Sequence, residues 1–363
     1  MVDRGGVLSM SGGRWVRVAA LGRAAGVAWL RGDAAGCRAA LDRQRRLADG
    51  HPPSEVTAFT SSALFTAASG HPGEARHDLA EAGSRLHAVG IAALAPQWEQ
   101  AALVCDWVAG DRAAAQARTA RLEAMPPPVP AAVTLSLRAE VLRRTGRTDE
   151  ARCLAGRLAA AAPTALAAWA LAGLDPEPSM ALTRLRHATE TAVRDGHRGL
   201  LPLLLHRTAR IAAEAASPET AAEAHAAFGR LADESPLTRV LAALTEARAT
   251  ASPEPARRAH RLSESTGLTA LAAESLDLAA RLGSGAPPPT GREHVPALTP
   301  RERELAALVR TGRTNRQIAE AMHLSVKSVE AYLTRVYAKT GCATRLELAL
   351  ALAEGRLDTG RPS

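Results

Sequence analysis

A glycine-centred turn recurs at nearly constant spacing in the first half of the chain, and this repeat constrains the fold more than any other feature. Gly32, Gly70, Gly110 and Gly146 are separated by 38, 40 and 36 residues. Each glycine follows a stretch rich in alanine and leucine and precedes a polar residue or proline, which is how one helix ends and the next begins. A repeat of this length with two helices per unit predicts a helical-hairpin solenoid.

The same plan continues further along the chain. Ser217-Pro218-Glu219 and Ser252-Pro253-Glu254 lie 35 residues apart, and serine, proline and glutamate in this order favour a helix start. Residues 15–282 resemble tetratricopeptide repeats through Gly-Asp turns followed by alanines, as in LRGDAAGCRAAL and VAGDRAAAQARTARL. The large aromatic residues of that family are mostly replaced by alanine or leucine. An irregular all-helical bundle is therefore the alternative.

Composition supports an all-α fold and argues against several kinds of site. Aromatic residues make up only 3% of the chain, and alanine and leucine, which favour closely packed helices, supply most of the apolar side chains. The four cysteines (Cys37, Cys105, Cys153 and Cys342) are too widely spaced for a zinc or disulfide pattern, so we expect buried, reduced thiols. We find no signal peptide or long apolar run, and we expect a cytoplasmic protein without metal or cofactor.

The segment GSGAPPPTGREHVPA, residues 283–297, divides the chain. Three consecutive prolines cannot continue a helix, and the flanking glycine and serine residues favour a linker. The expected organisation is a flexible N-terminus (1–14), a helical-repeat domain (15–282), the linker, a second domain (298–355) and a flexible tail (356–363).

The second domain contains four helices that can be recognised from their first turns. Thr299-Pro300-Arg301-Glu302, Thr314-Asn315-Arg316-Gln317 and Thr344-Arg345-Leu346-Glu347 each have the form of a capping box, and Ser325 caps the third helix. Apolar residues then recur at helical spacing: Leu305, Leu308 and Val309; Ile318, Ala319 and Met322; Val326, Val329, Leu333 and Val336; and Leu348, Leu350 and Leu352. A short helix, a tight turn and a longer helix predict a helix-turn-helix, whose second helix fits the major groove of DNA.

Charge points to the same partner. Residues 310–345 hold seven lysines and arginines and two glutamates, which gives +5 of the +8 carried by the whole chain. The chain's only lysines, Lys327 and Lys339, and its only tyrosines, Tyr332 and Tyr337, all lie here. Lysine suits phosphate contacts. Each tyrosine is either a core residue or a residue whose hydroxyl reaches a phosphate.

This segment closely resembles the C-terminal DNA-binding domain of LuxR-type transcription regulators. The resemblance lies in LTPRERE, TNRQIAEAMHLSVKSVEAYLTRVYAKTG and TRLELA. It implies a four-helix domain with the third helix, residues 326–340, in the major groove and the fourth helix contributing to dimerisation. Glu330 stands where many relatives have lysine, and Thr340 replaces a usual leucine.

Ten residues are candidates for contact with double-stranded promoter DNA. A carboxylate such as that of Glu330 accepts from a cytosine amino group, an alanine methyl such as that of Ala331 meets a thymine methyl, and cationic side chains neutralise phosphates. The candidates are Arg313, Asn315, Lys327, Ser328, Glu330, Ala331, Thr334, Arg335, Lys339 and Arg345.

The motifs of other functions are missing from the sequence. Neither lysine follows the glycine-rich run of a phosphate-binding loop, and no His-Glu-x-x-His or other catalytic constellation is present. We therefore expect a transcription regulator rather than an enzyme. Its helical repeats would sense a protein or small-molecule effector, with homodimerisation on DNA and RNA polymerase as a further partner. The alternatives are a helical-repeat interaction scaffold, or a truncated ATP-binding LuxR regulator that lacks its ATPase domain.

Overall fold

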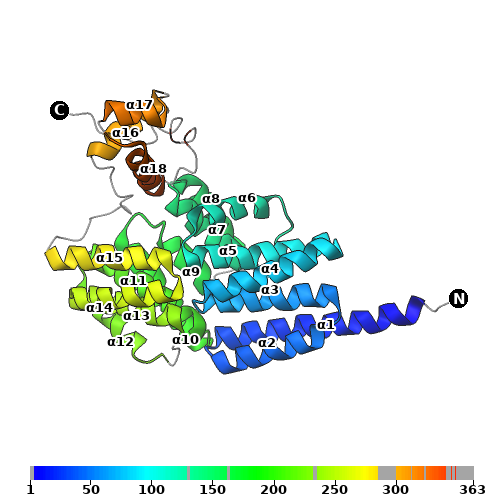
Figure 1. Cartoon of the computed structure of the whole chain (residues 1–363). Coiled ribbons are helices and arrows are strands. Elements are labelled where there is room, and N and C mark those ends of the chain that lie inside the picture. The colour runs from blue at the N-terminus through cyan, green and yellow to red at the C-terminus, as the bar shows by residue number, and fades with distance from the viewer. Residues whose placement is uncertain are drawn as a thin grey trace. The chain divides into compact units, whose positions relative to one another are not determined.

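The computed structural model shows an all-α protein, which confirms the predicted fold class (Figure 1). It describes residues 4–128, 131–161, 164–231, 235–284, 300–311, 313–322 and 324–340, together with Arg345 and Leu348, and contains no strand within these residues. The chain divides into two compact units, Met1–Thr290 and Gly291–Ser363. Most of the predicted linker and all of the predicted tail lie outside the described residues.

The first unit is a succession of helical hairpins, coloured from blue to yellow in Figure 1. Two short 3-10 helices, η1 (Ala92–Leu94) and η2 (Arg198–Leu200), precede α5 and α11. The α-helices are α1 (Arg4–Leu30), α2 (Ala34–Ala48), α3 (Pro52–Ala68), α4 (Pro72–Val89), α5 (Ala95–Ala109), α6 (Arg112–Glu123), α7 (Ala131–Arg144), α8 (Thr148–Ala161), α9 (Ala165–Ala172), α10 (Pro178–Arg194), α11 (Leu201–Glu214), α12 (Pro218–Phe228), α13 (Pro236–Thr250), α14 (Pro253–Thr266) and α15 (Thr269–Ser284).

Local sequence sets these hairpin turns. All four glycines of the repeat adopt positive φ angles between the two helices of a hairpin, where a residue without Cβ is favoured. The polar residue that follows then caps the next helix in two of them. Asp33 accepts from the Gly36 N–H at 2.8 Å, and Asp111 accepts from the Ala114 N–H at 3.0 Å.

Three local expectations differ from the structure. Helix α1 begins at Arg4, inside the segment expected to be flexible. Ser217 and Ser252 do precede helices, but neither side chain accepts a capping bond from a backbone N–H of the first turn, and the Ser217 hydroxyl instead donates to the Thr220 hydroxyl at 3.0 Å. Cys37 and Cys105 are buried as expected, whereas Cys153 is exposed.

The odd-numbered helices form the inner layer of the array. Each of them, from α1 to α15, contacts the next odd-numbered helix, while each even-numbered helix packs against its two chain neighbours. One continuous apolar core runs from α3 to α15 along this layer. It consists largely of alanine and leucine, and the small alanine side chains let helices approach closely.

The array also closes on itself, because three early turns contact the starts of three late helices. A Cβ on Gly110 would lie 2.5 Å from Ala270 Cβ, and the Thr269 hydroxyl donates to the Ala109 carbonyl. The Leu237 N–H, at the start of α13, donates to the Ser69 carbonyl at 3.3 Å. In the same way the end of α1 contacts η2. Hairpins far apart in sequence are thereby joined.

The second unit contains α16 (Pro300–Arg310), α17 (Asn315–Ala321) and α18 (Val326–Thr340). Most of the apolar residues predicted to face inward do so. The core consists of Leu305, Ala306, Val309, Ile318, Ala319, Val329, Leu333, Val336 and Leu348. Val326 is an exception, since it is 42% exposed. It is the first residue of α18 and lies at the end of the buried stripe. Leu350 and Leu352 lie outside the described residues.

None of the described helices is both long and apolar enough to cross a membrane. The described residues also contain no cluster of histidine, cysteine, aspartate and glutamate side chains with the arrangement of a metal site.

Candidate nucleic-acid interface

Helix α17 begins with the capping box that the sequence predicts. The Thr314 side chain accepts from the Gln317 N–H at 3.3 Å, and the Gln317 side chain accepts from the Thr314 N–H at 2.9 Å. These two bonds satisfy N–H groups that have no partner inside the helix. The start of α17 is therefore fixed.

A tight turn leads from α17 into α18. The Met322 N–H donates to the Ile318 carbonyl at 2.9 Å and the Leu324 N–H donates to the Ala319 carbonyl at 2.8 Å, which ends α17. Ser325 then caps α18 by accepting from the Ser328 N–H at 3.1 Å, as predicted. This succession of helix, tight turn and capped longer helix is the geometry of a helix-turn-helix.

The core determines which side of α18 is accessible. Val329, Leu333 and Val336 are buried against the apolar residues of α16 and α17. Glu330 is exposed, and it lies next to the buried stripe in sequence but on another face of the helix. Tyr332 and Tyr337 are half-buried and pack against the core with their rings. This packing is what we expect if both tyrosines are core residues. Contact of their hydroxyls with phosphate stays a prediction.

Three of the candidate phosphate contacts lie together at the start of α17. Arg345 donates from Nη1 to Asn315 Oδ1 at 2.9 Å, and its other terminal nitrogen donates to the Arg313 carbonyl. Arg313 itself is exposed, and Asn315 and Arg345 are half-buried. Sequence reasoning placed these residues individually and missed the bonds that join them across 30 positions. No local signal predicts these bonds.

The structure places the remaining candidates less completely. The Ser328 hydroxyl lies 2.8 Å from the Ser325 hydroxyl, so it takes part in the cap, and its contact with DNA stays a prediction. The other five candidates lie on the backbone of α18, but their side chains are outside the described part of the structure, and their roles also stay predictions: Lys327, Ala331, Thr334, Arg335 and Lys339.

Comparison with known proteins identifies this unit. Residues 296–352 match the family described as "Bacterial regulatory proteins, luxR family", so the chain carries a luxR-family helix-turn-helix domain near its C-terminus. Over 51 residues the chain is 51% identical to the tetrathionate response regulatory protein TtrR of Salmonella typhimurium, and the match covers 14% of this chain and 25% of TtrR.

Two further relatives match the same domain. The transcriptional regulatory protein ComA of Bacillus subtilis is 39% identical over 64 residues, which cover 18% of this chain and 30% of ComA. The response regulator Rre1 of Synechocystis sp. is 44% identical over 50 residues, which cover 14% and 22% of the two chains. The matched segment thus spans less than a third of each of these three relatives. No solved structure matches the chain.

Proposed function

We propose that this protein is a sequence-specific DNA-binding transcription regulator and that α18 enters the major groove of promoter DNA. The luxR-family match over residues 296–352 carries the proposal. The capped helix-turn-helix with one apolar and one accessible face supports it, because the major groove admits a single α-helix. The excess positive charge of residues 310–345 is what a phosphate backbone attracts. Binding as a homodimer and a cytoplasmic location belong to the same proposal.

The proposal divides the candidate residues into two groups. Lys327, Arg335 and Arg313 neutralise phosphates and position the domain, which adds affinity for every sequence. Glu330 carries a negative charge on an exposed face and reduces attraction to the backbone. Its place in a recognition helix is explained if the carboxylate reads a base, for which a cytosine amino group is the natural donor, or if it orients a neighbouring arginine.

A binding titration at several salt concentrations tests this division. Each of the substitutions Lys327→Ala and Arg335→Ala should weaken binding to all duplexes and lower the slope of log K against log salt by roughly 1. Glu330→Ala should instead strengthen non-specific binding and relax the preference at one base pair by about 1–3 kcal/mol. Arg257→Ala is the control, because Arg257 forms an exposed ion pair with Glu254 in the first unit and should leave the slope unchanged.

A full chain that binds no duplex at low salt would refute the proposal and favour the interaction scaffold. An unchanged base preference in the Glu330 variant, with a changed preference in the Lys327 variant, would show that the two roles are reversed.

The helical array is the sensor region in this proposal. The continuous inner layer of odd-numbered helices supports the likeness to tetratricopeptide repeats, since hairpin solenoids present such a layer to their ligands. An effector bound there would act on the DNA-binding domain of the same chain, with RNA polymerase as a further partner. Deletion of the array should therefore leave specific DNA binding intact but abolish its response to the effector.

A further inference from the structure

Arg345 bridges two residues beside the start of α17 that lie far from it in the sequence. Its Nη1 donates to Asn315 Oδ1 at 2.9 Å, and its Nη2 donates to the Arg313 carbonyl. Leu348, three residues after Arg345, is fully buried in the core of the domain. Residues three positions apart on a helix are neighbours, so the buried leucine helps to hold the arginine in place.

The backbone of Arg313 is held from two directions. Its N–H donates to the Leu308 carbonyl at 3.3 Å, near the end of α16, and its carbonyl accepts from Arg345. The next residue, Thr314, belongs to the capping box with Gln317. Because this acceptor is part of a fixed turn, it also fixes the plane of the guanidinium that bonds to it.

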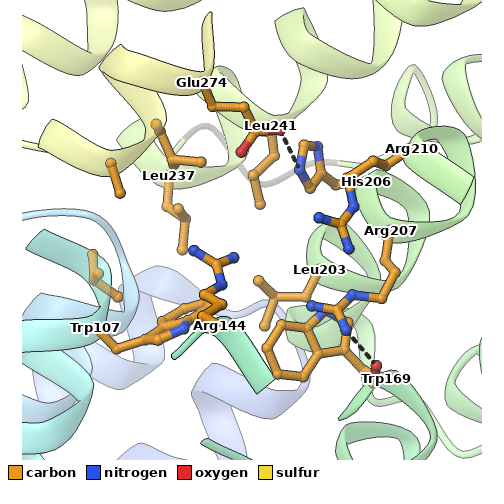
Figure 2. Close-up of a pocket in the computed structure, with 13 residues that line it drawn as sticks. Trp107, Arg144, Trp169, Leu203, His206, Arg207, Arg210, Leu237, Leu241 and Glu274 are labelled. Carbon is orange, nitrogen blue, oxygen red and sulfur yellow. Dashed lines mark hydrogen bonds and ion pairs between the residues drawn. The ribbon is translucent and has the colours of Figure 1, made fainter. Parts of the chain in front are cut away.

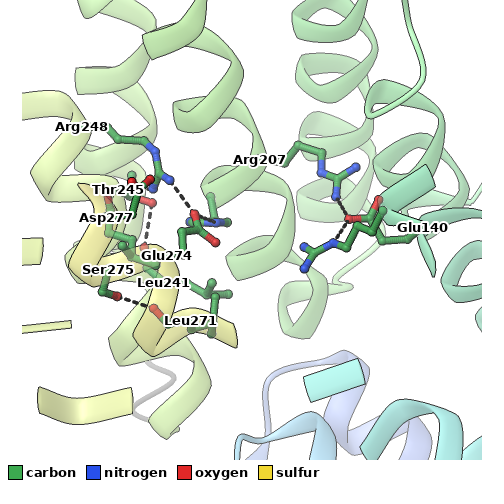
Figure 3. Close-up of polar contacts among 12 residues, drawn as sticks. Glu140, Arg207, Leu241, Thr245, Arg248, Leu271, Glu274, Ser275 and Asp277 are labelled. Atoms are coloured by element: carbon green, nitrogen blue, oxygen red, sulfur yellow. Dashed lines mark hydrogen bonds and ion pairs between the residues drawn. The ribbon is translucent and has the colours of Figure 1, made fainter. Parts of the chain in front are cut away.

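The bonds of Arg345 differ from those of a buried structural arginine of the array. Arg207 is 3% exposed, and it donates to the Trp169 carbonyl at 3.0 Å (Figure 2) and to the Glu140 carboxylate at 2.8 Å (Figure 3), which is a counter-charge. The two acceptors of Arg345 are neutral oxygens. These bonds therefore use the rigid fork of donors that an arginine has and a lysine lacks.

The bond from Arg345 determines how the side chain of Asn315 is oriented. A carboxamide has an acceptor oxygen on one side and an NH2 donor group on the other, and a half-turn exchanges the two. Since a guanidinium can only donate, it selects the orientation with Oδ1 toward Arg345. The NH2 group then faces away from Arg345, and within the described part of the chain it has no hydrogen-bond partner.

A DNA phosphate is the acceptor that fits this NH2 group. In a helix-turn-helix the helix that precedes the recognition helix crosses the DNA backbone, and asparagine side chains commonly donate to phosphate oxygens. The neighbouring Arg313 side chain is exposed and cationic. The backbone N–H groups of Thr314 and Gln317 are already satisfied by the capping box, so the contact depends on side chains.

We propose that Arg345 is a positioning residue for DNA binding. It holds the Asn315 carboxamide with its NH2 group toward a backbone phosphate, and it acts through Asn315 and not by a phosphate contact of its own. The inference rests on the proposed function, because it assigns different roles to two residues of the same DNA-binding surface.

Loss of Arg345 should turn the Asn315 side chain over. The Arg313 carbonyl then lacks its donor and lies near the carboxamide, because one guanidinium bonds to both groups. The NH2 group of Asn315 can take the place of that donor, which directs the carboxamide oxygen toward the phosphate, where two acceptors repel. A net hydrogen bond favours this inactive orientation by about fivefold, and the affinity for DNA falls by the same factor.

A double-mutant cycle on the full chain tests the coupling. The probe is fluorescently labelled duplex DNA of random sequence at low salt, because phosphate contacts do not depend on base sequence. Asn315→Ala should weaken binding by about tenfold, since a hydrogen bond to a charged group is lost. Arg345→Ala should weaken it by about fivefold or more.

The double variant gives the decisive comparison. It should bind about fivefold more tightly than the product of the two single losses predicts, because no carboxamide is left for Arg345 to hold. The cycle also removes the general effect of losing one positive charge, which is the same in both backgrounds. Losses that simply multiply would overturn the inference, since Arg345 would then act independently of Asn315.

The matched control is Arg316→Ala in the same cycle. Arg316 follows Asn315 directly, and its side chain is exposed and lies 3.7 Å from Glu320. It carries the same charge as Arg345 but does not bond to the carboxamide. Its loss should multiply with that of Asn315→Ala. Equal coupling of Arg316 and Arg345 to Asn315 would overturn the inference.

A charge-conserving variant separates positioning from phosphate neutralisation. Arg345→Lys keeps the positive charge, which suits a phosphate, but loses the fork that bonds to two oxygens at once. It should still bind at least about threefold more weakly than the unaltered chain. Full recovery of affinity would show that Arg345 serves as a phosphate cation and would overturn the inference.

Thermal unfolding checks that each variant is folded at the temperature of the titration. If Arg345→Ala is not, Arg345→Lys takes its place in the cycle with Asn315→Ala. An unaltered chain that binds no duplex would refute the proposed function and this inference together. A chain that binds duplex DNA while the losses at Arg345 and Asn315 multiply would refute the inference alone.

Discussion

Closure of the helical array can be tested at two glycines that differ in one respect. Gly110 and Gly146 have similar backbone angles, with φ of +84° and +80°. A Cβ on Gly146 would meet nothing within 4 Å, whereas a Cβ on Gly110 would lie 2.5 Å from Ala270 Cβ and 2.6 Å from Ala270 N. Comparing the single variants Gly110→Ala and Gly146→Ala therefore separates the backbone cost from the cost of disturbing the contact between α5 and α15.

The expected magnitudes follow from these distances. An alanine with positive φ costs roughly 1–2 kcal/mol, partly offset because alanine reduces the entropy of the unfolded chain. Gly146→Ala should therefore destabilise the array by about 1 kcal/mol. In Gly110→Ala the new methyl group must push the backbone of α15 away, and such overpacking adds about 1–3 kcal/mol. The difference between the variants measures the closing contact.

Urea unfolding followed by tryptophan fluorescence is the appropriate assay. All five tryptophans lie between residues 15 and 169, so the signal reports the array and not the C-terminal luxR-family domain. Equal losses of free energy of unfolding in the two variants would mean that α5 and α15 do not touch in solution. The closed arrangement would then be refuted.

Three further predictions concern individual side chains. Glu140→Gln should destabilise the array by about 3–5 kcal/mol in the same assay, because the buried Arg207 and the partly buried Arg143 and Arg144 lose the buried carboxylate that they share, whereas Glu150→Gln on the exposed surface should change little. The free energy of unfolding should fall as pH drops from about 6.5 toward 4, because the unfolded chain protonates His206 while burial keeps the pKa of His206 in the folded chain at about 4. His206→Gln should remove this part of the pH dependence. The same pH profile in this variant would contradict the lowered pKa of His206. Thr314→Ala should destabilise the isolated C-terminal domain by about 0.5–2 kcal/mol in thermal unfolding, because the cap of α17 is lost. An unchanged melting temperature would show that the capping box is dispensable.

The sequence by itself determined the local elements of both units. Gly32, Gly70, Gly110 and Gly146 marked the hairpin turns because only glycine adopts positive φ without a steric cost. In the second unit the Thr314 capping box and the Ser325 cap could also be predicted, because a cap is a local interaction between residues three positions apart. The position of the luxR-family domain could be predicted as well, because its motif is continuous in the sequence.

The environment of some side chains in the luxR-family domain could not be predicted from local sequence. Val326 has the spacing of an inward residue but is exposed, because burial depends on which helix covers a position and not on periodicity alone. Arg345 has the appearance of a surface cation, yet it bonds to Asn315 and to the Arg313 carbonyl. Its partners lie 30 or more residues away, and the repeat and capping rules that predict neighbours contain no information about them.

Only the tertiary structure decided that the array closes. Arg207 meets Glu140 across 67 positions, and Thr269 meets Ala109 across 160 positions. Each hairpin is rotated slightly relative to the previous one, and these rotations add up along the array. Local sequence fixes where each helix starts and ends, but the sum of many small rotations determines whether early hairpins meet late ones, and therefore which distant side chains come into contact.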